Sequence, residues 1–469
     1  MTLRATVVAI TLALAAPVPF AQAKAGPSAS ELQAAQTQLQ VQMQALAERL
    51  NQLEADNAVL KGEVAQLNAV LGRREAEIET LKSQTQGLSE EVDVVARDAG
   101  QLQGAEWASR IRMKGDLRVR SDRLESERVV GTGETARVGD AADRDRPRFR
   151  ARFSAEAQVT ENSKVVLGLT SGDGDPRSGN QTFTNASSAK SVYIDLAYAD
   201  WTFAPGARLV LGKQKQPWWR TGQSLFIDAD INPEGAAATF ERGVFFGSVY
   251  GAMLQENYSS NPEGRNQDPH ILGGQAGLKF AMLGGETRLA AHYYDCGACQ
   301  GNAPYWSGGN AYGNTTVADG SLQVLKYDYD VLILQAQVGS TLVGYPFLVW
   351  ADWAQNLASG VEYDTAFDVG VTLGKAADRR TWEAGLLYQS MDKDAMFAQL
   401  IDSDFAAGNT DGHGWALRFG YAPVKNITLN AMYMMSRTNK DVAPVSGPGY
   451  EIGKDLDYDR LQLDVNYRF

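Results

Sequence analysis

The sequence predicts an all-β fold, a 16-stranded antiparallel transmembrane β-barrel, preceded by an α-helical coiled coil. Three patterns in the 469 residues lead to this prediction. Leucines recur every seven residues near the start of the chain, and from residue 109 onward apolar and polar residues alternate with a period of two. The connections between the alternating segments are in turn long and polar or very short, as in barrels that cross a membrane.

The first 23 residues have the pattern of a secretory signal peptide. Arg4 precedes an apolar run from Val7 to Ala16, and Ala21-Gln22-Ala23 places small residues at a cleavage position. The apolar run is too short for a transmembrane helix. We therefore expect residues 1–23 to be removed on export and residues 24–30 to form a linker.

Residues 31–95 carry the heptad pattern of a coiled coil. Leucine recurs every seven residues from Leu32 to Leu67, and the register resumes at Leu81 and Leu88. The narrow apolar stripe favours a coiled coil over one amphipathic helix that packs on another surface. The heptads alone do not choose between two and three chains. Residues 96–108 follow as a polar linker before the barrel domain, residues 109–469.

The alternating segments begin at Ile111 and end at the last residue. In the closing stretch, Leu461, Leu463, Val465, Tyr467 and Phe469 alternate with polar residues, and the chain ends on the aromatic residue. Lipid would cover the apolar face of such a strand, and the polar face would line a watery lumen. An even number of strands places both ends of the barrel on one rim, which we expect to be the periplasmic rim.

Composition excludes several classes of function. The formal net charge of -12 argues against a nucleic-acid partner. The three histidines, His270, His292 and His413, are not paired in the sequence with a nucleophile, so we expect no enzyme, and no pattern indicates a cofactor. Cys296 and Cys299 are predicted to form a local disulfide in a long connection. A zinc site would need two further ligands, and no metal site is predicted.

At this point the chain resembles the bacterial outer-membrane "putative porin" family, relatives of the general diffusion porins. The resemblance covers residues 109–469 and implies a barrel in the outer membrane of a Gram-negative bacterium. An N-terminal coiled coil in the periplasm is common in the family and related porins are trimers, so the resemblance implies a homotrimer. The matching motifs are MKGDLRVRSD (113–122), SVYIDLAYADW (191–201), LVLGKQKQPWW (209–219), DADINPEG (228–235), IDSDFAAGNTDGHG (401–414) and DYDRLQLDVNYRF (457–469).

Basic residues on the polar face of the first two strands are the first candidate site. Arginine facing the bilayer midplane costs about 2–4 kcal/mol, so these side chains must face the lumen or lie near a rim. They are predicted either to form a basic pore wall that attracts anions or to pair with lumen carboxylates such as Asp116 and Glu156. The pore-lining candidates are Arg112, Lys114, Arg118, Arg120, Arg148, Arg150 and Arg152.

The long connection from Gln216 to Gly235 is the second candidate. The resemblance implies that the loop after the fifth strand folds inward, so Asp228, Asp230 and Glu234 are predicted to face the arginines across a constriction. Two alternatives remain: the acids cap a turn, or their Asp-x-Asp-x-Asn spacing binds calcium. The later glycine and glutamate of a calcium loop are absent from this spacing.

The sequence therefore predicts a water-filled channel for passive diffusion of small hydrophilic solutes and ions, in contact with outer-membrane lipid. The alternative is a structural anchor in which the coiled coil reaches towards the cell wall and contacts peptidoglycan. Charged lumen faces favour the channel, because a plugged anchor could fill its interior with apolar side chains.

Overall fold

The computed structural model describes residues 29–101, 109–257, 268–306 and 309–469, so the predicted signal peptide lies outside the described residues. The chain divides into two units, residues 1–103 and 104–469. The described part of the first unit is one helix, α1 (Ala29–Gln101), which continues beyond residue 95. Within the described ranges, no helix combines the length and the apolar character that a membrane span requires.

The heptad leucines of α1 are exposed in the single chain. Leu46, Leu53 and Leu60 keep 66%, 58% and 56% of their accessible surface. An isolated helix gains nothing from a regular apolar stripe, because the stripe contributes to stability only when another surface covers it. The coiled coil therefore stays a prediction. In a coiled coil, a second helix would cover the exposed leucine stripe of α1.

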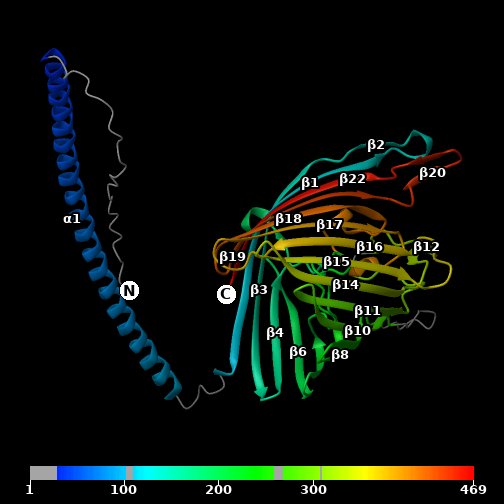
Figure 1. The fold of residues 1–469 in the computed structure, drawn as a ribbon. Helices are drawn as coiled ribbons and strands as arrows, with labels where there is room; N and C mark the ends of the chain where they lie inside the picture. The colour runs from blue at the N-terminus through cyan, green and yellow to red at the C-terminus, as the bar shows by residue number, and fades with distance from the viewer. Residues whose placement is uncertain (1–28, 102–108, 258–267, 307–308) are drawn as a thin grey trace. The chain divides into compact units, whose positions relative to one another are not determined.

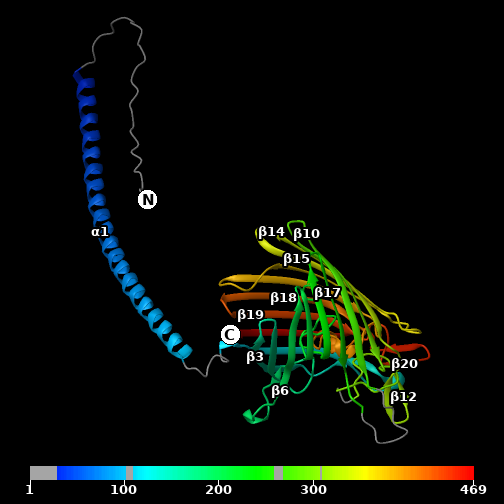
Figure 2. The same cartoon turned by 90° about the horizontal axis from the view of Figure 1, so that it is seen from below.

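The second unit is a closed antiparallel barrel of sixteen strands, as the sequence predicts. Figures 1 and 2 show it from two directions. The strands are β1 (Ile111–Val130), β3 (Arg144–Thr160), β4 (Ser163–Ser171), β6 (Val192–Ala204), β7 (Ala207–Lys213), β8 (Glu234–Arg242), β9 (Phe245–Met253), β10 (His270–Met282), β11 (Gly285–Gly297), β14 (Asp330–Leu342), β15 (Tyr345–Asn356), β16 (Thr365–Gly374), β17 (Thr381–Met391), β18 (Gly412–Val424), β19 (Ile427–Thr438) and β22 (Leu456–Arg468).

The barrel closes between its first and last strands. β1 pairs with β22 in antiparallel register, with Val119 opposite Val465 and Arg120 opposite Asp464. The two faces of β22 differ in exposure as the alternation predicts: Leu463 is 48% exposed, whereas Arg460 is 3% exposed. The face that carries Leu463 is the lipid-facing side, and the face that carries Arg460 lies inside the barrel.

Very short turns join the strands in pairs at one rim. The turn between β14 and β15 consists of Val343 and Gly344, both with positive φ, which is the geometry of a two-residue hairpin. The long connections carry small additional strands: β2 (Arg137–Asp140), β5 (Gln181–Thr182), β12 (Thr316–Asp319), β13 (Leu322–Leu325), β20 (Val445–Gly447) and β21 (Tyr450–Ile452).

Two long connections fold onto the inner face of the barrel. We call residues 214–233, between β7 and β8, the first inner loop, and residues 392–411, between β17 and β18, the second inner loop. Phe226 and Ile231 of the first loop and Phe397 of the second belong to one buried apolar cluster, together with Tyr294 of β11. Apolar side chains of both inner loops thus gather against one part of the inner face of the barrel.

Candidate functional site

The inner faces of β1 and β3 bring arginines directly opposite one another. Arg118 is opposite Arg150, and Arg120 is opposite Arg148. Arg120, Arg148 and Arg150 are only 6% to 8% exposed. Like charges directly opposite on adjacent strands repel, so this wall requires anions close by.

Carboxylates from the same wall neutralise part of this charge. Asp116 of β1 accepts hydrogen bonds from Arg150 Nη2 at 3.1 Å and from Arg152 Nε at 2.8 Å. Asp122 is fully buried and accepts from Arg460 through Nε at 2.7 Å and Nη2 at 2.8 Å. A two-point pair of this kind fixes the guanidinium plane as well as its charge.

The first inner loop contributes Asp230 to the wall. Its Oδ1 lies 3.1 Å from Arg150 Nη1 and 3.2 Å from Arg152 Nη1. One predicted acid therefore meets two of the predicted arginines, in a bridge that spans from the loop to β3. A cavity of about 320 Å³ lies beside this bridge and is lined by Arg150, Arg152 and Asp230.

The other two predicted acids lie elsewhere. Asp228 accepts from the backbone N–H of Asp230 at 2.8 Å and from that of Ser403 at 3.0 Å, as a turn-capping carboxylate does. Burial, followed by the charge of Asp402, raises the pKa of Asp228 well above its ordinary value. Glu234 begins β8 and pairs with Lys213 at 2.7 Å in an exposed position.

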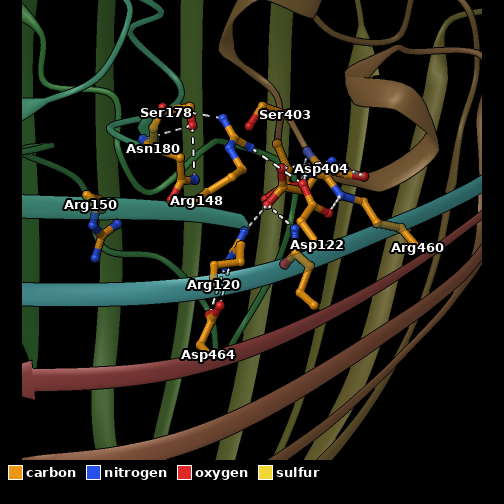
Figure 3. A network of polar contacts seen from close by, with 12 residues as sticks. Arg120, Asp122, Arg148, Arg150, Ser178, Asn180, Ser403, Asp404, Arg460 and Asp464 are labelled. Carbon is orange, nitrogen blue, oxygen red and sulfur yellow. Dashed lines mark hydrogen bonds and ion pairs between the residues drawn. The ribbon is translucent and has the colours of Figure 1, made fainter. Parts of the chain in front are cut away.

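The second inner loop supplies an acid that sequence reasoning missed. Asp404 lies 3.1 Å from Arg120 Nη1 and 3.0 Å from Arg460 Nη1, and it accepts from Gln462 at 2.9 Å. Figure 3 shows Asp404 above β1, close to Arg460 and Arg120. Arg120 also pairs with Asp464 of β22, whose Oδ1 is 2.7 Å from Nε.

The two inner loops use the same local arrangement. Each contains an Asp-x-Asp sequence, at 228–230 and at 402–404. Asp402 accepts from the backbone N–H groups of Asp404 and Phe405, just as Asp228 accepts from that of Asp230. In both loops the first aspartate caps the turn and the second reaches the arginines. This repeated spacing, in DADINPEG and in IDSDF, is the signal that could have found Asp404.

Side chains on the far wall hold the first inner loop in the lumen. Thr221 donates to Asp352 of β15 at 2.5 Å, and Ser224 donates to Asp368 of β16 at 2.5 Å. The loop therefore extends from β7 to the opposite strands, and its position is fixed at both ends. A connection on the outer surface would make none of these contacts.

Arg118 differs from the other arginines of the wall. Among the residues that the structure describes, no carboxylate lies within ion-pair distance of it. Its Nη2 donates to Asn180 Oδ1 at 2.7 Å, and its Nε has no hydrogen-bond partner there. A guanidinium that is not ion-paired attracts a mobile anion from the lumen more strongly than a paired one does.

The two remaining basic candidates lie near a barrel end. Lys114 pairs with Glu156 at 2.6 Å, as the pairing alternative predicts, and Arg112 is exposed and faces Glu156 across the strands. Cys296 and Cys299 form a disulfide. Both cysteines are fully buried in the apolar cluster, so the bond lies in the interior and not in an exposed loop.

A closed barrel with a charged inner wall and inner loops defines an outer-membrane channel protein. The sequence matches the model of the putative porin family over residues 32–323 and 325–469, so the chain belongs to that family. It forms an outer-membrane channel for diffusion. A search of curated proteins finds no match to this sequence.

Solved structures with a similar fold include porins from three bacteria. OprB of Pseudomonas putida is 12% identical, with 79% of this chain and 97% of that chain covered and a TM-score of 0.47. A triple mutant of the Rhodopseudomonas blastica porin is 12% identical over 76% and 100%, with a TM-score of 0.40. The anion-selective porin from Comamonas acidovorans is 11% identical over 76% and 99%, with a TM-score of 0.44.

Proposed function

We propose that the barrel passes small hydrophilic solutes and ions through a constriction beside the bridge that joins the first inner loop to the arginine wall. The bridge from Asp230 to Arg150 and Arg152 is the observation that carries this proposal. It places opposite charges at the same level of the lumen, in a wall of low dielectric constant. Such a transverse field orders water and selects solutes by charge.

The same network supports a preference for anions. The ion-paired guanidiniums there belong to Arg120, Arg146, Arg148, Arg150, Arg152 and Arg460, and the carboxylates to Asp116, Asp122, Asp230, Asp404 and Asp464. Arg118 lies beside them and is bonded to Asn180. The cations outnumber the anions. Fixed positive charge near a narrow passage raises the local concentration of anions and lowers that of cations.

Reversal potentials in a planar bilayer under a salt gradient test this proposal. Asp230→Asn removes the acid of the bridge, so it should move the reversal potential further towards anion selectivity. Asp378→Asn is the control, because it removes one negative charge from the exposed short connection between β16 and β17 and does not line this cavity. Equal shifts for the two variants would mean that Asp230 does not line the passage.

We also propose that α1 joins three copies of the chain in the periplasm. The exposed heptad leucines support an association of helices, and membership of the porin family favours three chains over two. Contact of α1 with peptidoglycan stays a prediction, and the charged inner wall does not favour a purely structural anchor over a channel.

A further inference from the structure

Two cavities lie in series along the arginine wall. The cavity of about 320 Å³ beside the bridge extends to Gly174 and Ser178, in the long connection between β4 and β6. A second cavity, of about 380 Å³, extends to Lys114 near the start of β1 and to Arg468 at the end of β22. The long connection and these strand ends belong to opposite rims of the barrel, so a solute that crosses along this wall meets the two cavities in turn.

Three charged residues line both cavities and mark the place where the cavities meet. Arg150 and Arg152 come from β3, and Asp195 comes from β6. The side chain of Arg152 keeps 28% of its accessible surface, and Asp195 is half-buried. We call these three residues the junction. It presents positive charge from one strand and negative charge from another strand to the same space.

A β-bulge directs Asp195 towards the lumen. Leu196 is opposite Gly168 of β4. Ile194 is opposite Leu169, the next residue of β4, so Asp195 is left without an opposite residue on that strand. Ile194 is 58% exposed and Leu196 is 7% exposed, whereas residues two positions apart share one face of a regular strand. The bulge therefore changes which face of β6 the side chains occupy, and bulges commonly re-aim a side chain at a functional site.

The first inner loop fixes the orientation of the Asp195 carboxylate. Asn232 Nδ2 donates to Asp195 Oδ1 at 2.6 Å, and Asn232 Oδ1 accepts from Lys215 Nζ at 3.0 Å. A neutral amide therefore holds the carboxylate at this oxygen without cancelling its charge. Asp230 differs from Asp195, because both arginines of the junction are ion-paired with Asp230.

We propose that the junction favours zwitterionic solutes of the amino-acid type over uncharged solutes of the same size, with the solute carboxylate at Arg150 and Arg152 and the solute ammonium at Asp195. The inference deepens the proposed function and rests on it for the passage through which the solute moves. A solute with only a carboxylate meets the repulsion of Asp195, and a solute with only an ammonium meets that of the arginines. A solute with both charges pairs with both strands, in a wall of low dielectric constant where charges act strongly.

Swelling of proteoliposomes that contain the full-length protein tests this preference. The two probes are free alanine, which carries both charges at neutral pH, and its isomer lactamide, in which a hydroxyl and an amide replace the ammonium and the carboxylate. Free alanine should enter wild-type proteoliposomes faster than lactamide, after subtraction of the rates in protein-free liposomes. Asp195→Asn keeps the acceptor oxygen for Asn232 but removes the charge, so the ratio of the two rates should fall by about two- to fivefold.

Asp378→Asn is the matched control, because it removes one aspartate charge from the exposed connection between β16 and β17 and lines neither cavity. Its ratio of rates should equal that of the wild type. Both variants should migrate as folded bands before heating, and the wild-type comparison stands by itself if Asp195→Asn does not fold. An unchanged ratio in a folded Asp195→Asn barrel, or slower entry of free alanine than of lactamide into wild-type proteoliposomes, overturns the proposal.

Conductance distinguishes this inference from the proposed function. A protein that conducts ions but passes the two probes in the same ratio with and without the Asp195 charge refutes selection at the junction and leaves the channel intact. A protein that conducts no ions and admits neither probe refutes the proposed passage itself.

Discussion

Asp228 accepts a hydrogen bond from the backbone N–H of Ser403, at 3.0 Å, and this contact joins the two inner loops. Two backbone hydrogen bonds also join the loops. The N–H of Asp228 donates to the carbonyl oxygen of Leu400 at 2.8 Å, and the N–H of Asp402 donates to the carbonyl oxygen of Leu225 at 3.3 Å. The loops are distant in sequence but hold each other inside the barrel, so the position of one depends on the other.

The first prediction concerns this contact. Asp228→Ala leaves the backbone N–H groups of Asp230 and Ser403 without their acceptor, and a buried donor left unpaired costs about 1–3 kcal/mol. Single-channel records should show larger open-state noise because the loops separate more often. Glu234→Gln, at the exposed start of β8, is the control and should leave the noise unchanged. Identical noise in all three proteins would mean that the contact does not position the loops.

The second prediction compares two arginines of the wall. Arg460→Gln removes the two-point partner of Asp122 and one of the two arginines on Asp404, while Arg146 and Arg120 stay in place. It should therefore destabilise the barrel by less than the about 3–5 kcal/mol that an uncompensated buried charge costs. Arg118→Gln removes a cation that has no carboxylate partner among the described residues, so it should reduce anion selectivity with little loss of stability. Heat-modified gel mobility measures unfolding, and reversal potentials measure selectivity. A larger loss of stability in the Arg118 variant would contradict this account.

The third prediction is a dependence on pH at Asp411, just before β18. Asp411 accepts from the backbone N–H of Asp441 at 2.5 Å, which joins the second inner loop to the connection before β22. Burial, with a smaller contribution from the charge of Asp441, raises the pKa of Asp411 to about 6. The folded protein therefore holds a proton that the unfolded chain loses near its lower, ordinary pKa.

The direction in which stability changes with pH follows from that difference in pKa. The contribution of Asp411 to stability is fully present below the ordinary aspartate pKa of about 4, and it falls as the pH rises through about 6. Unfolding temperatures of Asp411→Asn should accordingly vary less with pH across this window than those of the wild type. Parallel curves for the two proteins would exclude Asp411 as the source.

The fourth prediction tests the helix. Leu53→Asp combined with Leu60→Asp places charges in the exposed apolar stripe of α1 and should reduce the mass of the full-length protein in sedimentation equilibrium, or make its subunits dissociate more readily. Ala58→Asp combined with Ala65→Asp adds the same charges outside the stripe and serves as the control. An unchanged mass together with unchanged dissociation of the subunits in the first variant would exclude α1 as an assembly element.

The fifth prediction tests the orientation of the barrel. Ser446→Cys, in the exposed β20–β21 hairpin, should react with a membrane-impermeant thiol reagent on intact cells. Asp378→Cys, in the short connection between β16 and β17, should react only after the outer membrane is opened. The reverse labelling pattern would place the long connections in the periplasm.

Sequence reasoning reached the barrel because strand alternation is local. The side-chain period of two assigns Arg118, Arg148 and Arg150 to the inner face without reference to any other strand. The choice of ion-pair partner is not local, because Arg120 and Asp404 are 284 residues apart in sequence. Which carboxylate reaches which arginine depends on how the loops fold inside the barrel, and no period in the sequence encodes that.

The second inner loop illustrates this difficulty. Its segment 391–412 reads as one more long polar connection, yet Met396 and Phe397 are almost completely buried. The short apolar run from Ala395 to Ile401 was the available sign that this connection packs inside. The same difficulty applies to Asp228. It lies two residues before Asp230 in sequence, but it accepts a hydrogen bond from the backbone of the second inner loop and does not pair with the arginines.

The pairing of Asp122 with Arg460 has a consequence for how the protein is inserted into the membrane. The two residues are 338 positions apart and belong to the first and last strands. Until β22 is in place, Asp122 lacks its two-point partner and Arg120 lacks Asp464. A barrel that is still open thus has an incomplete arginine wall, and the electrical character of the passage is established only when the final strand seals the cylinder.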